Sequence, residues 1–359
     1  MSRPATALID LAALRHNLNR ARMAAPRRRV IAAVKANGYG HGVVRVAQGL
    51  TAADGFAVAC IEEAVQLREA GINQPVVLLE GVFEPAELVL CQQLGLEVVV
   101  HNHDQLRMLE QTDLEQPLSV WMKIDSGMHR LGFDPDQVSA VWQRLNDCPN
   151  VAQPVRVLSH LAKADERDDN FTLRQLLLFN KLSRAFKCER SLANSAAVLS
   201  WPQTHFDCIR PGLMLYGASP FIDSFGTEEG LQPVMTLTTR LIAVRRLDRG
   251  EPVGYGGGWT CPETMNVGIA AIGYGDGYPR HAPNGTPVRV NDCDVSLVGR
   301  VSMDMLCIDL RQCPDAKVGD PVTLWGRGLP IERVARAAST IPYTLMCGVT
   351  SRVHIREEN

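Results

Sequence analysis

The sequence has no long apolar run, no concentrated charge and no paired cysteine motif. Nowhere do about 18 apolar residues follow one another, which argues against a membrane-spanning helix. The first residues, MSRPATALID, lack the apolar segment of a signal peptide. The formal net charge is −2 with no basic tract, so nothing favours nucleic acid or an anionic membrane as a partner. We therefore expect a cytoplasmic protein that binds neither.

The ten cysteines are scattered and form no CxxC pair. In a chain of 359 residues this indicates reduced, mostly packing cysteines rather than a disulfide framework. GxSxG and HExxH motifs are also missing. His101 and His103 share one face of a predicted strand, but no third ligand is near in sequence, so we expect no metal site.

Short apolar runs alternate with helical patterns through the first two-thirds of the chain. Most runs are continuously hydrophobic, which is typical of strands covered on both faces. They span residues 30–35, 55–60, 76–81, 97–102, 119–124, 155–160, 191–195 and 206–212. Asp10 can N-cap a helix over residues 11–25, and Val138, Val141, Trp142 and Leu145 have helical spacing. This α/β pattern predicts a (β/α)8 TIM-type barrel; the alternative is an open doubly wound sheet, which the lack of GxGxxG disfavours.

The pattern changes near residue 231. The segments PVMTLTTRLIAVRRL, PVRVNDCDVSLVG and MLCIDL alternate polar and apolar residues and are separated by glycine and proline, with one helical stretch near residues 331–338. We therefore predict a barrel over residues 11–231 and a smaller, mainly antiparallel β domain over residues 232–359.

Catalytic residues of a barrel lie where its strands end. The predicted strand ends carry Lys35, Lys123, Asp125, His160, Asn194, Ser195, Arg210 and Gly212. Burial lowers the pKa of a lysine and makes it a nucleophile toward carbonyls, so Lys35, in AAVKANGYGHG, is a candidate Schiff-base partner. A lysine that reaches solvent from a sheet edge is the alternative interpretation.

The last two predicted strands end in ANSA and RPGLMLYG, which contain Ser195 and Gly212. Barrels often bind phosphate at this position through glycine backbone N–H groups and small hydroxyl side chains, although an ordinary turn would also explain RPG. Arg130 lies just beyond a strand end, where a guanidinium either binds a carboxylate bidentately or remains a surface group.

Four of the six tyrosines occur in three clusters. Tyr255 lies in GYGGGW, Tyr274 and Tyr278 in GYGDGY, and Tyr343 in IPYTLM. Each ring either caps a turn or, with a cationic neighbour that lowers its pKa, acts as a proton carrier.

Together these motifs resemble bacterial alanine racemase, a fold-type III enzyme that depends on pyridoxal 5′-phosphate (PLP). The resemblance extends in order from residue 33 to residue 353, over nearly the whole chain. The segments that carry it are AVKANGYGHG, WMKIDSGMHRLG, SHLAKADE, DCIRPGLMLYG, EPVGYGGGW, GYGDGYPR, GRVSMDM and TSRV. Gly38 and Ser302 depart from the residues that relatives often carry, and neither position holds a proton carrier.

The resemblance implies roles for individual residues. Lys35 binds PLP covalently and, with Tyr255, exchanges the Cα proton of alanine in a two-base reaction. Arg210 faces the pyridine nitrogen with His160 beside it. The remaining positions fall into four groups: phosphate or other cofactor contacts (Tyr39, Asn194, Ser195, Gly212, Tyr343), substrate contacts (Arg130, Met303), substrate entry (Tyr274) and a lysine that is often carbamylated (Lys123).

The resemblance also implies a homodimer in which Tyr255 reaches the partner's cofactor, and a first strand, within residues 2–10, that can join the β domain. The product D-alanine would supply peptidoglycan, or the enzyme would serve alanine catabolism; the sequence does not separate the two. The alternatives are a broad-specificity racemase, a decarboxylase of the same fold type and a non-catalytic PLP-binding protein.

Overall fold

The computed structural model describes residues 3–358. The predicted first strand could begin at residue 2, and the predicted β domain ends at residue 359; both of these residues lie outside the described range. Contacts divide the chain into two units. The barrel unit comprises Arg15–Leu215 and Pro220–Ser224, and the β unit comprises the chain up to Leu14, Tyr216–Ser219 and the chain from Phe225 onward.

The barrel unit is built on a closed ring of eight parallel strands in chain order. The strands are β2 (Arg29–Ala33), β3 (Gly55–Val58), β4 (Val76–Leu78), β5 (Glu97–Val100), β6 (Leu118–Lys123), β7 (Val151–Leu158), β8 (Arg190–Ser191) and β9 (Cys208–Ile209). Arg29 pairs with Cys208, so β2 and β9 close the ring. The predicted barrel is confirmed.

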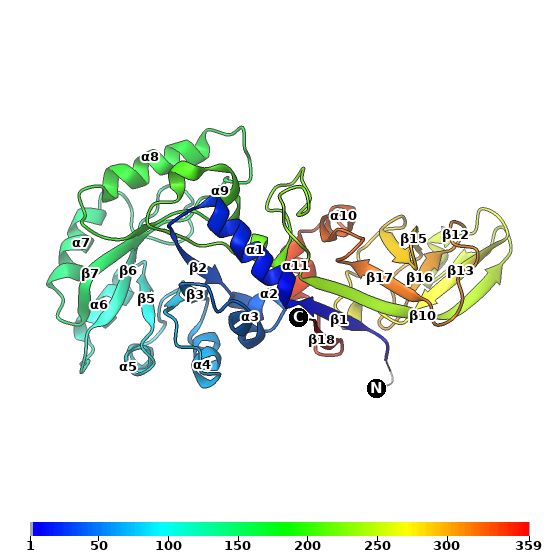
Figure 1. Cartoon of the computed structure of the whole chain (residues 1–359), viewed down its shortest axis with the longest axis horizontal. Coiled ribbons are helices and arrows are strands. Elements are labelled where there is room, and N and C mark those ends of the chain that lie inside the picture. Colours follow the sequence, from blue (N-terminus) through cyan, green and yellow to red (C-terminus); the bar gives the residue numbers. More distant parts are fainter. Residues whose placement is uncertain (1–2, 359) are drawn as a thin grey trace. The chain divides into compact units, whose positions relative to one another are not determined.

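Helices surround this ring (Figure 1). They are α1 (Leu11–Ala24), α3 (Val43–Gly49), α4 (Ile61–Glu69), α5 (Pro85–Gln93), α6 (His103–Gln111), α7 (Val138–Asp147), α8 (Phe171–Ser183) and α9 (Ser195–Ser200). Asp10 caps α1 as predicted, because its Oδ1 accepts a hydrogen bond of 2.8 Å from the backbone N–H of Ala13. The predicted apolar face of α7 is buried at Val138, Val141 and Leu145.

The strands are hydrophobic because side chains cover both faces of the ring. Seven strands each contribute one buried residue to a common cluster: Ile31, Ala57, Val77, Val99, Trp121, Leu158 and Cys208. The last two strands are shorter than predicted. Asn194 caps α9 by accepting from the N–H of Ala197, and Pro211 has no N–H to donate to a neighbouring strand, so neither strand continues to the predicted end.

The β unit contains an eight-stranded sheet in the order β13-β16-β15-β14-β17-β10-β1-β18. The strands are β1 (Thr6–Asp10), β10 (Met235–Leu247), β13 (Met265–Ala270), β14 (Pro287–Val290), β15 (Cys293–Val298), β16 (Leu306–Asp309), β17 (Pro321–Trp325) and β18 (His354–Glu358). A separate pair, β11 (Pro252–Val253) and β12 (Trp259–Thr260), forms a small hairpin. The helices of this unit are α10 (Ile331–Ala337) and α11 (Pro342–Cys347).

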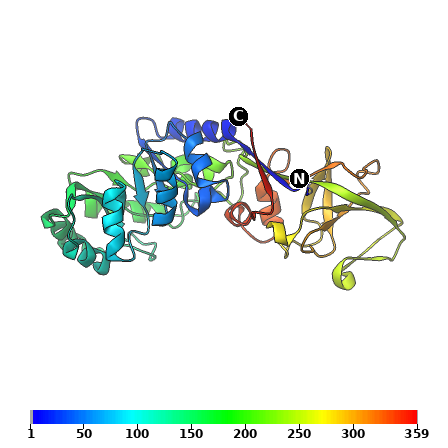
Figure 2. The same ribbon diagram turned by 90° about the horizontal axis from the view of Figure 1, so that it is seen from below.

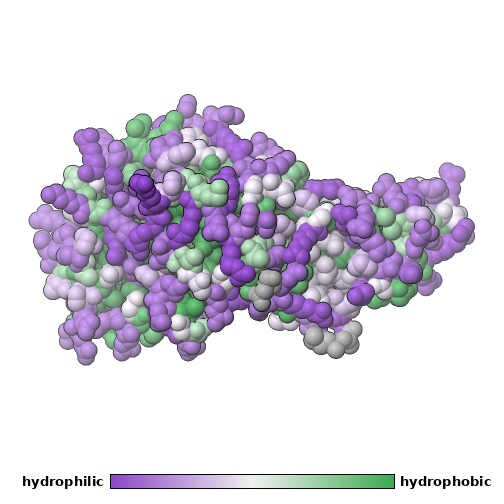
Figure 3. Space-filling model, viewed as in Figure 1, coloured by the Kyte–Doolittle hydropathy of each residue, from purple (hydrophilic) through white to green (hydrophobic). Residues whose placement is uncertain are grey.

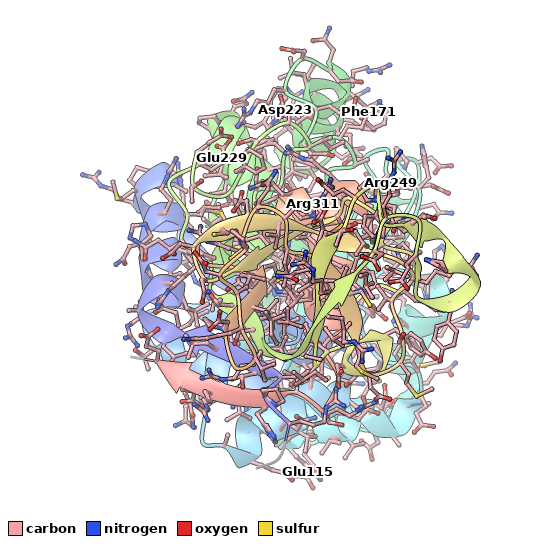
Figure 4. All side chains as sticks on the ribbon, turned by 90° about the vertical axis from the view of Figure 1, so that its right-hand side faces the viewer. Glu115, Phe171, Asp223, Glu229, Arg249 and Arg311 are labelled. Atoms are coloured by element: carbon pink, nitrogen blue, oxygen red, sulfur yellow. The ribbon has the colours of Figure 1, made fainter. Side chains whose placement is uncertain are left out.

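The sheet of the β unit is antiparallel except where β1 and β18 pair in parallel, with Thr6 opposite His354. Figure 2 shows these two strands, dark blue and red, side by side. Exposed loops of this unit carry ion pairs: Arg311, labelled in Figure 4, lies 3.1 Å from Glu263 and 2.7 Å from Asp309. The predicted antiparallel β domain is confirmed.

Polar side chains dominate the face drawn in Figure 3, with apolar ones scattered among them. Within residues 3–358, every helix is too short or too polar to cross a membrane. In the same described range, no group of three or more His, Cys, Asp or Glu side chains is placed to hold a metal ion.

Candidate active site

The chain turns left-handed directly after Lys35. The segment labelled α2 in Figure 1, Lys35–Tyr39, follows the end of β2. Its residues Ala36, Asn37 and Gly38 have φ angles of 52°, 53° and 61°, and Tyr39 has φ 51°. A left-handed conformation costs a non-glycine residue roughly 1–2 kcal/mol, so the surrounding structure must stabilise this turn.

His41 provides part of that stabilisation. It is fully buried, and its Nδ1 lies 2.9 Å from the carbonyl oxygen of Tyr39 and 3.1 Å from that of Gly38. Burial lowers the pKa of His41 to about 4, so the ring is neutral near pH 7 and Nδ1–H donates to these carbonyls. The side-chain oxygen of Asn37 accepts a further bond of 2.9 Å from the N–H of Val43.

The turn places Tyr39 against the end of β9. A Cβ atom at Gly212 would lie only 2.4 Å from the hydroxyl oxygen of Tyr39, so this close approach requires glycine. Ser195 Oγ accepts hydrogen bonds from the N–H groups of Gly212 at 2.8 Å and Met214 at 3.3 Å. Two hydroxyl groups and the backbone of a glycine therefore gather beyond the ends of β8 and β9.

Arg210 and His160 lie at the same end of the barrel. Arg210 is buried and donates to the hydroxyl of Ser191 and the carbonyl of Ser159. Burial lowers the pKa of Arg210 to about 10, so it stays charged at neutral pH. The pKa of His160 is well below its ordinary value because of burial first and the nearby guanidinium of Arg210 next, so its imidazole is neutral.

Lys123 ends β6 and completes a cluster of cations. Burial, and after it the charges of Arg210, Arg130 and Lys35, together lower its pKa from 10.5 to about 8, while Asp125 opposes them. Asp125 is itself occupied, since it accepts from the backbone N–H groups of Gly127 and His129. An excess of buried positive charge favours a ligand with several negative charges.

Two further predicted site residues are Asn194, which caps a helix, and Arg130, which is exposed to solvent. Asn194 Oδ1 accepts from Ala197 N at 3.1 Å to cap α9, and its amide nitrogen lies 3.4 Å from the Leu161 carbonyl oxygen. Arg130 is exposed beyond the end of β6. The predicted residues that interact through their charges are Lys35, Lys123, Arg130, His160 and Arg210. Tyr39 and Ser195 both lie against Gly212.

The β unit carries the other predicted residues. Tyr255 lies in the short 3-10 turn η3 (Tyr255–Gly257) between β11 and β12 and is 68% exposed. Tyr274 begins the turn η4 (Tyr274–Asp276), and its N–H donates to Ser302 O at 3.0 Å. Met303 is exposed beside this turn, and Tyr343 lies on α11.

A buried carboxylate that was not predicted holds the Tyr274 turn. Asp276 is fully buried and accepts from the N–H of Gly273 at 2.9 Å. Its other contacts are Arg3, at 2.6 Å, and Arg352, at 3.3 Å. Asp276 and Arg352 each lie in a segment that carries the resemblance, GYGDGY and TSRV, but nothing in the sequence indicated that they meet each other and Arg3.

Comparisons with known proteins cover nearly the whole chain. A family model described as alanine racemase, N-terminal domain matches residues 9–220, and one described as alanine racemase, C-terminal domain matches residues 234–357. The chain is 57% identical over 347 residues to alanine racemase of Nitrosococcus oceani, covering 97% of each chain.

Two further relatives are named as biosynthetic enzymes. The chain is 50% identical over 353 residues to the biosynthetic alanine racemase of Escherichia coli K12, covering 98% of each chain. The crystal structure of biosynthetic alanine racemase from Pseudomonas aeruginosa superimposes with a TM-score of 0.97 at 48% identity, covering 99% of this chain and 100% of that one.

Proposed function

Since this chain belongs to the alanine racemase family, we propose that it interconverts L-alanine and D-alanine with bound PLP. The observation that carries the proposal is the cation cluster at the carboxyl ends of the barrel strands, where Lys35 follows β2 and stands near Lys123 and Arg210. When bound, PLP supplies an electron sink that weakens the Cα–H bond of the amino acid.

The barrel residues fit this cofactor. Tyr39, Ser195 and Gly212 would hold its phosphate, because they bring hydroxyl groups and a side-chain-free backbone together. Arg210 and the neutral His160 would lie along the pyridine ring, and Lys35 would hold the cofactor covalently. Asn194 and Tyr343 are further proposed cofactor contacts.

Lys35 and Tyr255 are the proposed proton carriers at Cα. Racemisation requires removal of the proton on one face and delivery on the other, so two groups must act. We assign Lys35 to the proton of D-alanine and Tyr255 to that of L-alanine. Arg130 and Met303 would contact the substrate, and Tyr274 would line its entry.

Tyr255 is proposed to act in the site of a partner subunit. The 68% exposure of Tyr255 on a three-residue turn supports this proposal, because a ring that contacts another subunit must be accessible on the single chain. The functional unit would then be a homodimer with two shared sites. The neutral fraction of the Lys123 amine, sizeable because its pKa is about 8, is the form that reacts with carbon dioxide, so we also propose its carbamylation.

The D-alanine product is proposed to supply peptidoglycan in the cytoplasm, as the names of the biosynthetic relatives suggest. Complementation of a D-alanine auxotroph tests this role. Failure to restore growth by an expressed, active protein would argue against it.

A chiral assay of the purified protein tests the activity itself. L-alanine should become a racemic mixture, faster after addition of PLP, while lysine and serine stay largely unchanged. Lys35→Ala should abolish both the activity and the visible absorbance of bound PLP. An active Lys35→Ala protein, or equal turnover of all three amino acids, would contradict the proposal.

The assignment of faces has its own test. Tyr255→Phe should stop the exchange of solvent deuterium into L-alanine and leave part of the exchange into D-alanine, because Lys35 remains. NMR of each enantiomer incubated in D2O measures both rates. Equal losses would show that the two groups do not act on separate faces.

A further inference from the structure

Glu63 hydrogen-bonds two loops of the barrel unit at once. It lies in the first turn of α4, outside every motif considered above. Its Oε1 accepts from the backbone N–H of Asn37 at 3.1 Å, and its Oε2 accepts from that of Ala59 at 2.9 Å. Ala59 directly follows β3, the neighbour of β2 in the ring. One carboxylate thus joins the left-handed turn after Lys35 to the end of the next strand.

Backbone hydrogen bonds within residues 34–42 also stabilise the turn. Gly38 N donates to Val34 O at 2.8 Å, Gly40 N to Ala36 O at 3.0 Å, and Gly42 N to Asn37 O at 2.8 Å. Glu63 adds a contact from α4, beside the bond that Val43 of α3 makes to the Asn37 side chain. It bonds the peptide nitrogen of Asn37, two residues after Lys35 and two before Tyr39.

We propose that Glu63 is a positioning residue for the racemase reaction: its carboxylate holds the left-handed turn, and the turn fixes the directions of Lys35 and Tyr39. Glu63 contacts backbone and carries no proton of the substrate. The inference rests on the proposed function, because that function gives Lys35 and Tyr39 their roles. The structural part, a turn that depends on Glu63, can be measured without any reaction.

The chain supplies a matched control. Glu62 precedes Glu63 on the same helix and has the same charge, but it is exposed and its side chain hydrogen-bonds to Cys60 instead of the turn. Glu62→Ala therefore removes a carboxylate from the same place while leaving the bond to Asn37 intact.

The experiment compares Glu63→Ala, Glu63→Gln and Glu62→Ala with the wild type. Hydrogen exchange of the peptide covering residues 35–43 is measured in protein freed of cofactor, followed by the affinity for added PLP and the kinetics with alanine. For Glu63→Ala we expect exchange and the Kd for PLP to rise about tenfold, as expected when a stabilising contact is lost.

The kinetic change should fall on kcat. Glu63→Ala should lower kcat about tenfold and leave the KM for alanine within about twofold, because the turn orients the proton carrier rather than the substrate. Glu63→Gln should give intermediate values, since its amide oxygen can accept only one of the two N–H bonds. Glu62→Ala should match the wild type in every measurement.

Unchanged exchange and PLP affinity in Glu63→Ala would overturn the inference, and so would equal impairment by Glu62→Ala, which would point to charge alone. If circular dichroism shows that Glu63→Ala does not fold, Glu63→Gln decides: wild-type exchange overturns the inference and faster exchange supports it. A wild type that exchanges as expected but does not racemise alanine would refute the proposed function and not the role of Glu63 in the turn.

Discussion

Lys123 is a buried cation whose neighbours are also cations. Burial lowers its pKa most, the charges of Arg210, Arg130 and Lys35 lower it as well, and Asp125 opposes them. Such a cluster is unfavourable for the protein without its ligand and favourable once a phosphate or a carboxylate enters. The cations that would bind an anionic ligand therefore destabilise the barrel as long as no ligand is bound.

We predict that Lys123→Met stabilises the cofactor-free protein near pH 7. The folded pKa of Lys123 lies below its unfolded value, so the charged form is destabilising below pH 8, and this penalty disappears as pH rises toward 10.5. The lowering from 10.5 to about 8 corresponds to roughly 3 kcal/mol. Urea unfolding in bicarbonate-free buffer at pH 7 and pH 10 measures it; a gain that does not shrink at pH 10 would contradict this account.

Gly212 is needed for the approach of Tyr39. We predict that Gly212→Ala weakens PLP binding about tenfold or more, because the added methyl would lie 2.4 Å from the tyrosine hydroxyl. Adding Tyr39→Phe removes that hydroxyl and should relieve the clash, although it also removes a proposed phosphate contact. Titration with PLP compares the two single variants with the double variant. Strictly additive losses would show that the two residues do not meet.

At the scale of secondary-structure elements, side chains on different barrel strands are linked by a series of polar contacts. Trp121 Nε1 on β6 donates to Glu97 on β5 at 2.6 Å, and Arg156 on β7 lies 3.3 Å from Glu97. Arg156 continues to Glu189 at 3.2 Å, and Glu189 binds Arg29 of β2 at 2.8 Å. These contacts connect strands around the ring independently of the backbone ladder.

We predict that Glu97→Ala destabilises the barrel by about 2 kcal/mol, because the buried indole N–H of Trp121 loses its acceptor and Arg156 loses a carboxylate partner while keeping Glu189. Glu110→Ala is the control: it breaks the exposed pair with Arg144, at 2.7 Å, and should cost about 1 kcal/mol or less. Urea unfolding followed by circular dichroism compares them. Equal losses would show that the buried contacts have no special weight.

Elements determined by the local sequence could be predicted, and elements determined by contacts in the folded chain could not. The ring of strands could be predicted, because burial on both faces leaves continuous apolar runs such as Val98, Val99 and Val100. The cation cluster could be expected, because parallel strands end at one edge. The left-handed turn could not, because Ala36 and Asn37 do not require it; contacts from His41 and Glu63, formed only in the folded chain, stabilise it. The role of Glu97 could not be predicted either, because it depends on contacts with Trp121 and Arg156 that form only in the folded chain.

At the scale of the whole molecule, the proposed dimer makes a prediction about mixed subunits. Lys35→Ala and Tyr255→Phe homodimers should both be nearly inactive. In a mixed dimer, one site combines both intact residues if Tyr255 acts in the partner, so reassociated mixtures should recover roughly a quarter of wild-type activity. Racemisation after unfolding and refolding the two variants together measures it. Recovery no greater than the sum of the separate variants would place Lys35 and Tyr255 of each site in one chain.

The parallel pairing of β1 with β18 has a consequence for synthesis on the ribosome. Thr6 emerges 348 residues before its neighbour His354. The intervening barrel strands can associate while translation continues, but one edge of β1 must stay unpaired until β18 has emerged. Ribosome-bound intermediates should therefore hold a formed barrel beside an unfinished sheet, and that edge is where a chaperone would be expected to engage.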